Sequence, residues 1–407
     1  MEFIDRPSYL DWLMSWKGHD LIKVVTGVRR AGKSTILELF RQRLATQGVT
    51  EKQLVCINLE DPDQERSFAV GLNLYDHLKA NLPNDQPSYV FIDEAQHLQE
   101  LERTVAGLSL LPNVDLYLTG SNSSFLGGDL ATRLTGRYVE LHVLPLSYKE
   151  YVTGFHPPDQ PSGTAFIDPW QTYLSDGGFP YTVRLHNDQQ MIREYLMDVL
   201  NTVALRDIAP RQSSFSPTLF DSILEFTFDN IGNLASVNKI SNTLTSMGRR
   251  TSRTAVETYL EGLVGSYLLY PARRYDLRGK AYLENSAKYY VVDTGMRRAL
   301  LGGRHPNVGH VLENIVFLEL LRRRCKVSVG KIGPAEVDFL ADGQDGLTYI
   351  QVCQTVSDPA VLERELTPLR TIQNNYPRLL LVGEDQPSTD HEGIRQLSVR
   401  EWLLGND

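Results

Sequence analysis

GVRRAGKS, residues 27–34, matches the pattern G-x-x-x-x-G-K-[ST]. The apolar run LIKVVT precedes it at residues 21–26, and the amphipathic segment STILELFRQRL follows it at residues 34–44. A strand that turns through glycines directly into a helix binds phosphate well, because backbone N–H groups and the helix N-terminus then face the anion. The stretch therefore predicts an α/β nucleotide-binding domain.

The same loop suggests roles for individual side chains. Lys33 is expected to reach the β- and γ-phosphates of ATP, and Ser34 is expected to bind Mg²⁺. Arg29 and Arg30 are expected to be solvated or to face the substrate rather than to take part in catalysis. The residues expected to contact the nucleotide are Gly27, Val28, Arg29, Arg30, Ala31, Gly32, Lys33, Ser34 and Thr35.

A pair of carboxylates follows farther along the chain. YVFIDE, residues 89–94, is an apolar run that ends in Asp93 and Glu94, as a buried strand does when it emerges at the phosphate edge of a sheet. Asp93 is expected in the Mg²⁺ shell, and Glu94 is expected to orient or deprotonate the attacking water. Since binding alone would not require the second carboxylate, Glu94 indicates hydrolysis.

Other polar residues are candidates for contact with the γ-phosphate. VDLYLTGSN, residues 114–122, predicts a further strand whose Ser121 or Asn122 either touches the phosphate or the water, or only forms a turn. Arg133 and Arg137 lie in the next segment and are candidates for an arginine finger supplied by a neighbouring subunit.

The apolar pattern predicts the fold class and the domains. Along residues 1–150, short apolar runs alternate with helix-length segments, which indicates an α/β fold of the P-loop type, a parallel sheet with helices on both faces. We expect an ATPase domain at 1–153, a helical region with a winged helix at 165–300, and a nuclease-like α/β domain at 305–407. The Pro/Gly-rich stretch 154–164 is the expected linker.

The net charge of −9 conceals a basic middle, because residues 191–331 hold 20 Lys/Arg against 13 Asp/Glu. Within it, a helix at 252–265 and a hairpin at 268–293 resemble the second helix and the wing of a winged helix. Arginines at these two places either contact DNA or are solvated while the domain packs against protein. The candidates for nucleic-acid contact are Arg249, Arg250, Arg253, Arg273, Arg274, Arg278 and Lys280.

AEVDFLADGQDGLTYIQVC, residues 335–353, predicts a β-hairpin in which Asp338 closes the first strand. A PD-(D/E)XK nuclease needs carboxylates for Mg²⁺ and a lysine beside the phosphate. Glu313, in the helix HVLENIVF, and Asp338 would supply carboxylates. The second strand, however, carries Gln351 and Cys353 in place of an acid and the lysine. We therefore expect a degenerate nuclease-like site without cleavage activity.

In their order along the chain, these motifs resemble bacterial and archaeal AAA+-type ATPases whose C-terminal region is of the DUF4143 type, a winged helix followed by a PD-(D/E)XK-like fold. The matching segments are VVTGVRRAGKST, FIDEAQHL, YLTGSNSSFL, LTGRYVELHVLPLSYKEY, DGGFP, YYVVDTGMRRALLG, HVLENIVFLELLRR and EVDFLADG with YIQV. The resemblance implies binding of ATP with Mg²⁺, and it carries over to Gly27, Gly32, Lys33, Ser34, Asp93 and Glu94.

We therefore expect an Mg²⁺-dependent ATPase that couples its nucleotide state to C-terminal modules binding nucleic acid or protein. The alternatives are a slow nucleotide-gated switch that recruits DNA or a protein and, behind it, an ATP-regulated nuclease. An arginine finger would require a ring or a dimer. The three cysteines have spacings that suit neither a disulfide framework nor a zinc site, and no apolar run reaches ~20 residues, so we expect a cytoplasmic protein without membrane contact.

Overall fold

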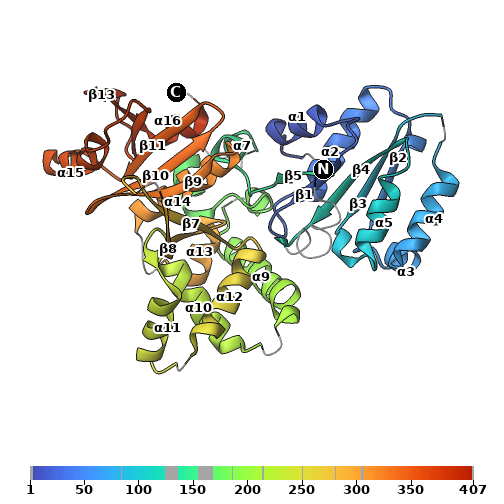
Figure 1. Ribbon diagram of the computed structural model, residues 1–407, viewed down its shortest axis with the longest axis horizontal. Helices are drawn as coiled ribbons and strands as arrows, with labels where there is room; N and C mark the ends of the chain where they lie inside the picture. Colours follow the sequence, from blue (N-terminus) through green and yellow to red (C-terminus); the bar gives the residue numbers. More distant parts are fainter. Residues whose placement is uncertain are drawn as a thin grey trace, which may run out of the picture. The chain divides into compact units, whose positions relative to one another are not determined.

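The computed structural model describes residues 3–83, 85–123, 136–154, 168–185, 187–212, 215–249, 251–279, 281–303 and 307–405. The chain forms two compact units (Figure 1). The N-terminal unit comprises residues 1–143 with 265–267, and the C-terminal unit comprises residues 144–264 with 268–407.

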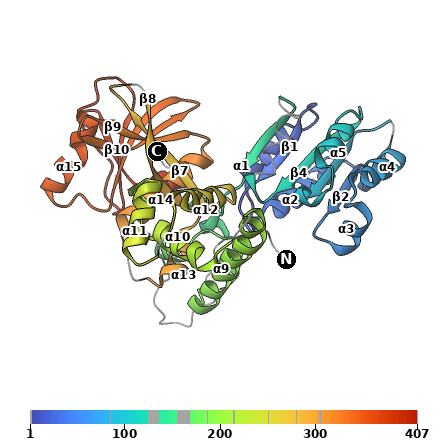
Figure 2. The same cartoon turned by 60° about the horizontal axis from the view of Figure 1, so that its bottom comes forward.

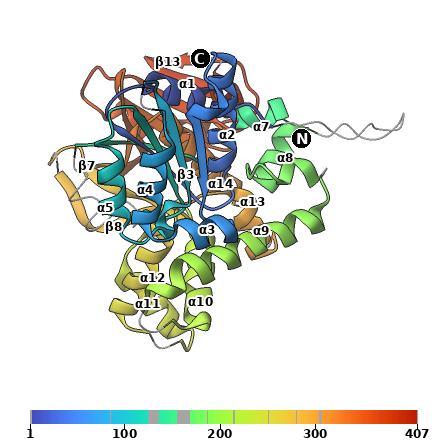
Figure 3. The ribbon, with the colours of Figure 1, turned by 90° about the vertical axis from the view of Figure 1, so that its right-hand side faces the viewer.

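The N-terminal unit is built on a five-stranded sheet in the order β2-β3-β4-β1-β5, in which all neighbouring strands are parallel. Helices lie on both faces of the sheet, which is the predicted α/β arrangement of a P-loop fold (Figure 3). The strands are β1 (Ile22–Thr26), β2 (Leu54–Asn58), β3 (Ser88–Asp93), β4 (Val114–Gly120) and β5 (Tyr138–His142). The helices are α1 (Pro7–Ser15), α2 (Lys33–Thr46), α3 (Pro62–Phe68), α4 (Gly71–Asn81) and α5 (Leu101–Leu108).

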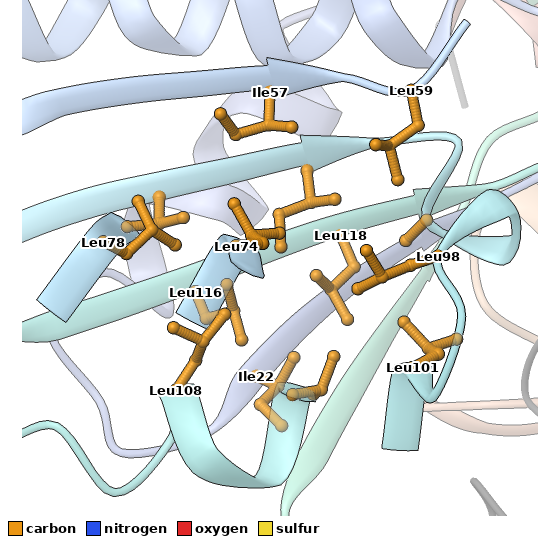
Figure 4. Packing of buried hydrophobic residues seen from close by; sticks show 14 of the residues in the cluster. Ile22, Ile57, Leu59, Leu74, Leu78, Leu98, Leu101, Leu108, Leu116 and Leu118 are labelled. Carbon is orange, nitrogen blue, oxygen red and sulfur yellow. The ribbon is translucent and has the colours of Figure 1, made fainter. Parts of the chain in front are cut away.

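The alternation of side chains along the strands divides the core of this unit into two layers. On one face, strand residues such as Leu116 and Leu118 pack against Leu74 of α4 and Leu108 of α5 (Figure 4). On the other face, the ring of Tyr117 lies 5.3 Å from that of Phe40 in α2. Since successive residues of a strand point to opposite faces, this sequence fills both layers from one strand.

The C-terminal unit contains a nine-stranded sheet in the order β13-β14-β12-β11-β10-β9-β7-β8-β6. Figure 2 labels β7, β8, β9 and β10 of this sheet. Its strands are β6 (Leu234–Ala235), β7 (Leu269–Asp276), β8 (Ala281–Val291), β9 (Lys326–Ile332), β10 (Ala335–Gly343), β11 (Gly346–Cys353), β12 (Arg378–Val382), β13 (Thr389–His391) and β14 (Ile394–Ser398). Its helices are α7 (Tyr148–Gly154), α8 (Pro169–Asp176), α9 (Gln189–Val203), α10 (Pro217–Asp229), α11 (Val237–Ser246), α12 (Arg253–Gly265), α13 (Thr294–Leu301), α14 (Val308–Arg322), α15 (Pro359–Arg370) and α16 (Val399–Leu404).

The expected wing and the expected nuclease-like hairpin belong to this one sheet. β7 pairs in parallel with β9, with Tyr275 opposite Gly330, and thereby joins the β7–β8 hairpin to the β10–β11 hairpin. The expectation that Asp338 closes its strand was wrong, because β10 continues to Gly343 while it pairs with β9 on one side and β11 on the other. Asp338 therefore lies in the middle of the sheet.

Several helices begin at a cap that the sequence makes easy to recognise. Asp61, Asp168, Ser216 and Asp358 each accept a hydrogen bond from a backbone N–H of the first turn, and each is followed by proline. The cap oxygen satisfies an N–H that lacks an intrahelical partner, and the proline ring presets the helical φ angle.

A buried ion pair connects two strands of the N-terminal sheet. The ammonium of Lys23 in β1 is fully buried and lies 2.6 Å from the carboxylate of Asp115 in β4. It also donates a hydrogen bond of 2.7 Å to the carbonyl oxygen of His19. The pair satisfies two groups that would otherwise be costly to bury.

We expect Lys23→Ala to lower the free energy of unfolding of the N-terminal unit by about 3–5 kcal/mol, because the buried carboxylate of Asp115 loses its counter-charge. Hydrogen-exchange protection of β1 and β4 amides measures the change. The control is Asp11→Ala, which removes an exposed partner of Arg43 and should cost about 0–1 kcal/mol. Equal losses in the two variants would contradict the assignment.

Candidate active site

The candidate site forms where three neighbouring parallel strands end. β1 runs into the phosphate loop after Thr26, β3 ends at Asp93, and β4 ends at Gly120. Thr26 is in register with Gly120, and Ile92 with Leu118. The carboxyl edge of a parallel sheet is where ligands bind in open α/β folds, because the loops after adjacent strands converge there.

The phosphate loop needs glycine at two places. A Cβ atom at Gly27 would lie 2.1 Å from the carbonyl oxygen of Val143, and φ is 142° there. Gly32 takes the N-cap of α2 with φ of 99°, in the left-handed region that glycine enters at little cost. The chain therefore turns directly into α2, whose first N–H groups face the loop.

The side chain of Lys33 folds back onto this loop. Its ammonium donates to the carbonyl oxygens of Gly27 and Val28 at 3.0 and 3.2 Å, and its side chain is buried. Arg6 donates a hydrogen bond of 3.0 Å to the carbonyl oxygen of Ala31 in the same loop. The loop backbone thus fixes the ammonium beside the phosphate-binding turn.

Thr119 connects the two predicted carboxylates. Its hydroxyl accepts a hydrogen bond of 2.8 Å from the backbone N–H of Glu94 and donates one to the carboxylate of Asp93. The hydroxyl of Ser34 lies near enough to Asp93 to lower the pKa of that carboxyl, so the two predicted Mg²⁺ ligands lie together. Burial raises the pKa of Asp93, although the hydroxyls of Thr119 and Ser34 oppose this rise.

Glu94 lies in a different electrostatic environment from its neighbour. Its carboxylate accepts hydrogen bonds from Gln96 and, at 3.2 Å, from the hydroxyl of Ser121. Burial alone would raise the pKa of Glu94, but the charges of Lys33 and Arg29, together with these two donors, lower it. The pKa values of the two adjacent carboxyls are thus shifted in opposite directions. The backbone of Glu94 has φ of 51°, which is uncommon for a residue other than glycine.

The other residues predicted for this site differ in whether they are buried or exposed. Arg29 is buried rather than solvated and lies 3.0 Å from Glu60, which follows β2. Arg30 is exposed, and Asn122 is buried. Arg137 is exposed, and Arg133 lies outside the described residues.

The side chains and backbone groups of this site fit Mg²⁺ and a nucleotide. The hydroxyl of Ser34 and the carboxylate of Asp93 are the hard oxygen ligands that Mg²⁺ prefers. The glycine turn, the first turn of α2 and Lys33 form the cradle that phosphate needs.

Sequence reasoning missed four residues that hold this site, namely Thr119, Gln96, Glu60 and Arg6. A signal existed for Thr119, because it lies two positions before Ser121 and so on the same side of β4. The roles of the other three depend on contacts between segments that are far apart or on a turn that no pattern specifies.

The predicted nuclease-like residues occupy the C-terminal sheet. Gln351 accepts a hydrogen bond of 3.3 Å from the backbone N–H of Asp338 and donates one of 2.9 Å to Glu365. Cys353 lies in an apolar cluster with Leu366 and Leu380. Burial, with the nearby carboxylates of Glu365 and Asp338, raises the pKa of the Cys353 thiol to about 12, so this side chain is a neutral core residue.

A lysine that the sequence analysis did not identify lies between the two predicted carboxylates. The ammonium of Lys288, on β8, is 2.8 Å from Glu313 and 3.3 Å from Asp338. The structure therefore brings Glu313 and Asp338 together, but through a cation of the chain itself.

The arginines predicted to contact nucleic acid differ in their environments. Arg249, Arg253, Arg273 and Arg278 are exposed. Arg274 lies 3.2 Å from Glu336 and is half-buried. Arg250 and Lys280 lie outside the described residues.

In the part of the chain that the structure describes, no cluster of three or more His, Cys, Asp or Glu side chains is arranged to hold a metal ion. Of the helices that the structure describes, none combines the length and apolar character needed to cross a membrane.

Comparisons with known proteins agree with this geometry. Residues 19–152 match the AAA domain family, and residues 167–307 match a domain of unknown function, DUF8612. A solved structure, the Walker-type ATPase PABY2304 of Pyrococcus abyssi, superposes with a TM-score of 0.50 and 19% identity, over 74% of this chain and 96% of that chain. At this identity the similarity supports the fold alone, and it agrees with an N-terminal P-loop ATPase fold.

Two relatives extend over most of the chain. An uncharacterized protein of Haemophilus influenzae is 36% identical over 98% of both chains. The uncharacterized protein MJ1544 of Methanocaldococcus jannaschii is 28% identical over 83% of this chain and 75% of its own length. The assignment of the C-terminal region to the DUF4143 type was wrong, because the matched family is DUF8612. The chain belongs to the same family as the Haemophilus influenzae protein, and its N-terminal part is an AAA domain with the P-loop ATPase fold.

Proposed function

We propose that this protein binds ATP with Mg²⁺, hydrolyses the β–γ phosphoanhydride, and couples the nucleotide state to its C-terminal modules. The observation that carries the proposal is the arrangement around Thr119, which holds Asp93 and Glu94 beside Ser34. The AAA domain match and the Walker-type fold support the same reaction class.

In this proposal the chemistry is an in-line displacement by water. Lys33 and the N-terminus of α2 neutralise phosphate charge, while Ser34 and Asp93 hold the metal, which when bound supplies further neutralisation of the transferred group. Glu94, whose carboxylate is ionised at neutral pH, takes a proton from the attacking water. Gln96 and Ser121 hold that carboxylate in place.

We expect Glu94→Gln to lower the rate of steady-state ATP turnover about 100-fold or more while leaving ATP affinity nearly unchanged, because the base is lost but the phosphate contacts remain. Phosphate release and nucleotide binding are measured in parallel.

The matched control is Glu100→Gln, which changes an exposed glutamate with nearly the same backbone φ of 52°. It should turn over ATP as the unaltered protein does. Turnover that survives Glu94→Gln would contradict the mechanism, and ATP binding without turnover in the unaltered protein would favour the nucleotide-gated switch.

We expect Gln96→Leu to move the acidic limb of the turnover–pH profile to higher pH. The amide of Gln96 stabilises the ionised form of Glu94 and helps to lower its pKa, so removal of this donor raises the pKa. Protonation then removes the base at a higher pH as the solution is acidified. A lower rate with an unmoved limb would mean that Gln96 only supports the local structure.

For the second half of the chain we propose a winged helix within residues 165–300 and an inactive nuclease-like domain at 305–407, both following an ATPase domain at 1–153. The order β6, α11, α12, β7 and β8 supports the winged helix. Exposed arginines at the start of α12 and on the β7–β8 hairpin support DNA as a partner.

Arg137 of the N-terminal unit is exposed, so it is free to act as an arginine finger on a neighbouring subunit in a ring or a dimer.

We expect Arg253→Glu with Arg273→Glu to weaken binding of duplex DNA and to reduce its salt dependence, because two phosphate contacts are lost. Fluorescence anisotropy at two salt concentrations measures both effects. The control is Arg66→Glu with Arg103→Glu, an equal charge change at exposed sites of the N-terminal unit. Equal loss in the two pairs would indicate only non-specific attraction, and undiminished binding would favour a protein partner.

A further inference from the structure

Four charged side chains meet inside the C-terminal sheet, from three elements that are far apart in the sequence. Lys288 comes from β8, Glu313 from α14, and Glu336 and Asp338 from β10. The Lys288 ammonium lies 2.8 Å from Glu313, 3.1 Å from Glu336 and 3.3 Å from Asp338. One cation is therefore shared by three carboxylates.

The remaining contacts of these carboxylates are also made by the chain. Glu336 has a second cationic partner, the guanidinium of Arg274 on β7, at 3.2 Å. The carboxylate oxygen of Glu313 that contacts Lys288 accepts a hydrogen bond of 2.6 Å from the hydroxyl of Tyr290. The second oxygen of Asp338 accepts one of 3.0 Å from the backbone N–H of Val352. A Cβ atom at Gly232 would lie 2.9 Å from the other oxygen of Glu313, so the backbone closes over that side.

The cluster is buried deeply enough for charge balance to matter. The side chains of Lys288 and Glu313 are 6% and 7% exposed, and that of Asp338 is 13% exposed. Burial alone would lower the pKa of Lys288, but the carboxylates of Asp338, Glu313 and Glu336 outweigh it and raise the pKa. Burial and the charge of Asp338 raise the pKa of Glu313 to about 7.

The position of the ammonium distinguishes this cluster from a metal-dependent nuclease centre. In such a centre the divalent cation lies between the carboxylates, and the lysine lies beside it, facing the phosphate. Here the Lys288 ammonium itself lies between the carboxylates: its 2.8 Å distance to Glu313 is typical of a charge-assisted hydrogen bond, and Glu336 and Asp338 lie at ion-pair distances of 3.1 and 3.3 Å. A divalent ion at the same point would meet the ammonium, and the two cations would repel each other.

We propose that Lys288 is a built-in substitute for a divalent cation: its ammonium fills the place of the metal among Glu313, Glu336 and Asp338, joins β8 to α14 and β10, and excludes metal-dependent phosphodiester cleavage. Gln351 and Cys353 fit this assignment, since the first is bound to Asp338 and Glu365 and the second is part of the apolar core.

The test removes the ammonium and supplies a metal in its place. Lys288→Ala should lower the melting temperature of the C-terminal unit, and Mn²⁺ should restore at least about 3 °C of it by binding to the vacated carboxylates. The double variant Lys288→Ala with Asp338→Asn should lose this restoration. The unaltered protein should show no such Mn²⁺ stabilisation of this unit. A folded Lys288→Ala protein that Mn²⁺ does not stabilise would overturn the proposal.

The matched control is Lys23→Ala, which also removes a fully buried ammonium but leaves a single carboxylate behind. It should be destabilised without rescue by Mn²⁺, because one carboxylate makes a poor divalent site. Rescue of this variant to the same extent would show a general effect of the ion and would contradict the assignment.

A second measurement decides the matter if Lys288→Ala does not fold. Equilibrium dialysis against Mn²⁺ without nucleotide is performed on Asp93→Asn protein, in which the other candidate metal site is impaired. Absence of binding supports the proposal. Mn²⁺ binding that Asp338→Asn abolishes, or DNA cleavage in the protein with Lys288 intact that Asp338→Asn abolishes, would overturn it and make Lys288 the lysine of an active nuclease.

Discussion

The parallel pairing of β3, β4 and β1 is the constraint on which the candidate active site depends. Three strands that end at the same edge bring together a glycine turn, two carboxylates and a polar strand end that are separated by many residues in the sequence. The register matters as much as the direction of the strands, because a shift by one residue would turn Thr119 to the opposite face. The close approach of Val143 to Gly27 then leaves the loop little freedom.

Both units bury a lysine between strands, with different consequences. Lys23 has one carboxylate partner and joins two strands of the parallel sheet as a balanced pair. Lys288 has three, and burial together with the charge of Asp338 raises the pKa of Glu313. The Lys23 pair stabilises the fold by connecting two strands. The Lys288 cluster contains three carboxylates around one point, as an ion-binding centre does.

The sequence was sufficient for those features that lie within one short segment. The glycine spacing, the apolar run before Asp93 and the alternation along residues 1–150 predicted the P-loop, the paired carboxylates and the parallel sheet. Asp338 was misplaced because the pattern DFLADG resembles a strand end, while pairing on both sides extends β10 to Gly343.

Contacts between distant segments could not be predicted in the same way. Lys288 was overlooked because a lysine was sought where the E-x-K motif would place it, and no local pattern shows that β7 pairs with β9. The ion pair of Arg29 with Glu60 was missed because it forms between the phosphate loop and the end of another strand. Such residues follow from tertiary register, which single-sequence periodicity does not contain.

The pairing of β7 with β9 also affects where the chain can be cut to give a stable fragment. A fragment that begins after α13 would leave β9 as an open edge, which is prone to pair with other chains. It would also retain Glu313, Glu336 and Asp338 without the ammonium that now lies among them. Residues 305–407 thus depend on β7 for a neighbour of β9 and on β8 for the counter-charge of three carboxylates, and we expect a fragment that begins after α13 to aggregate.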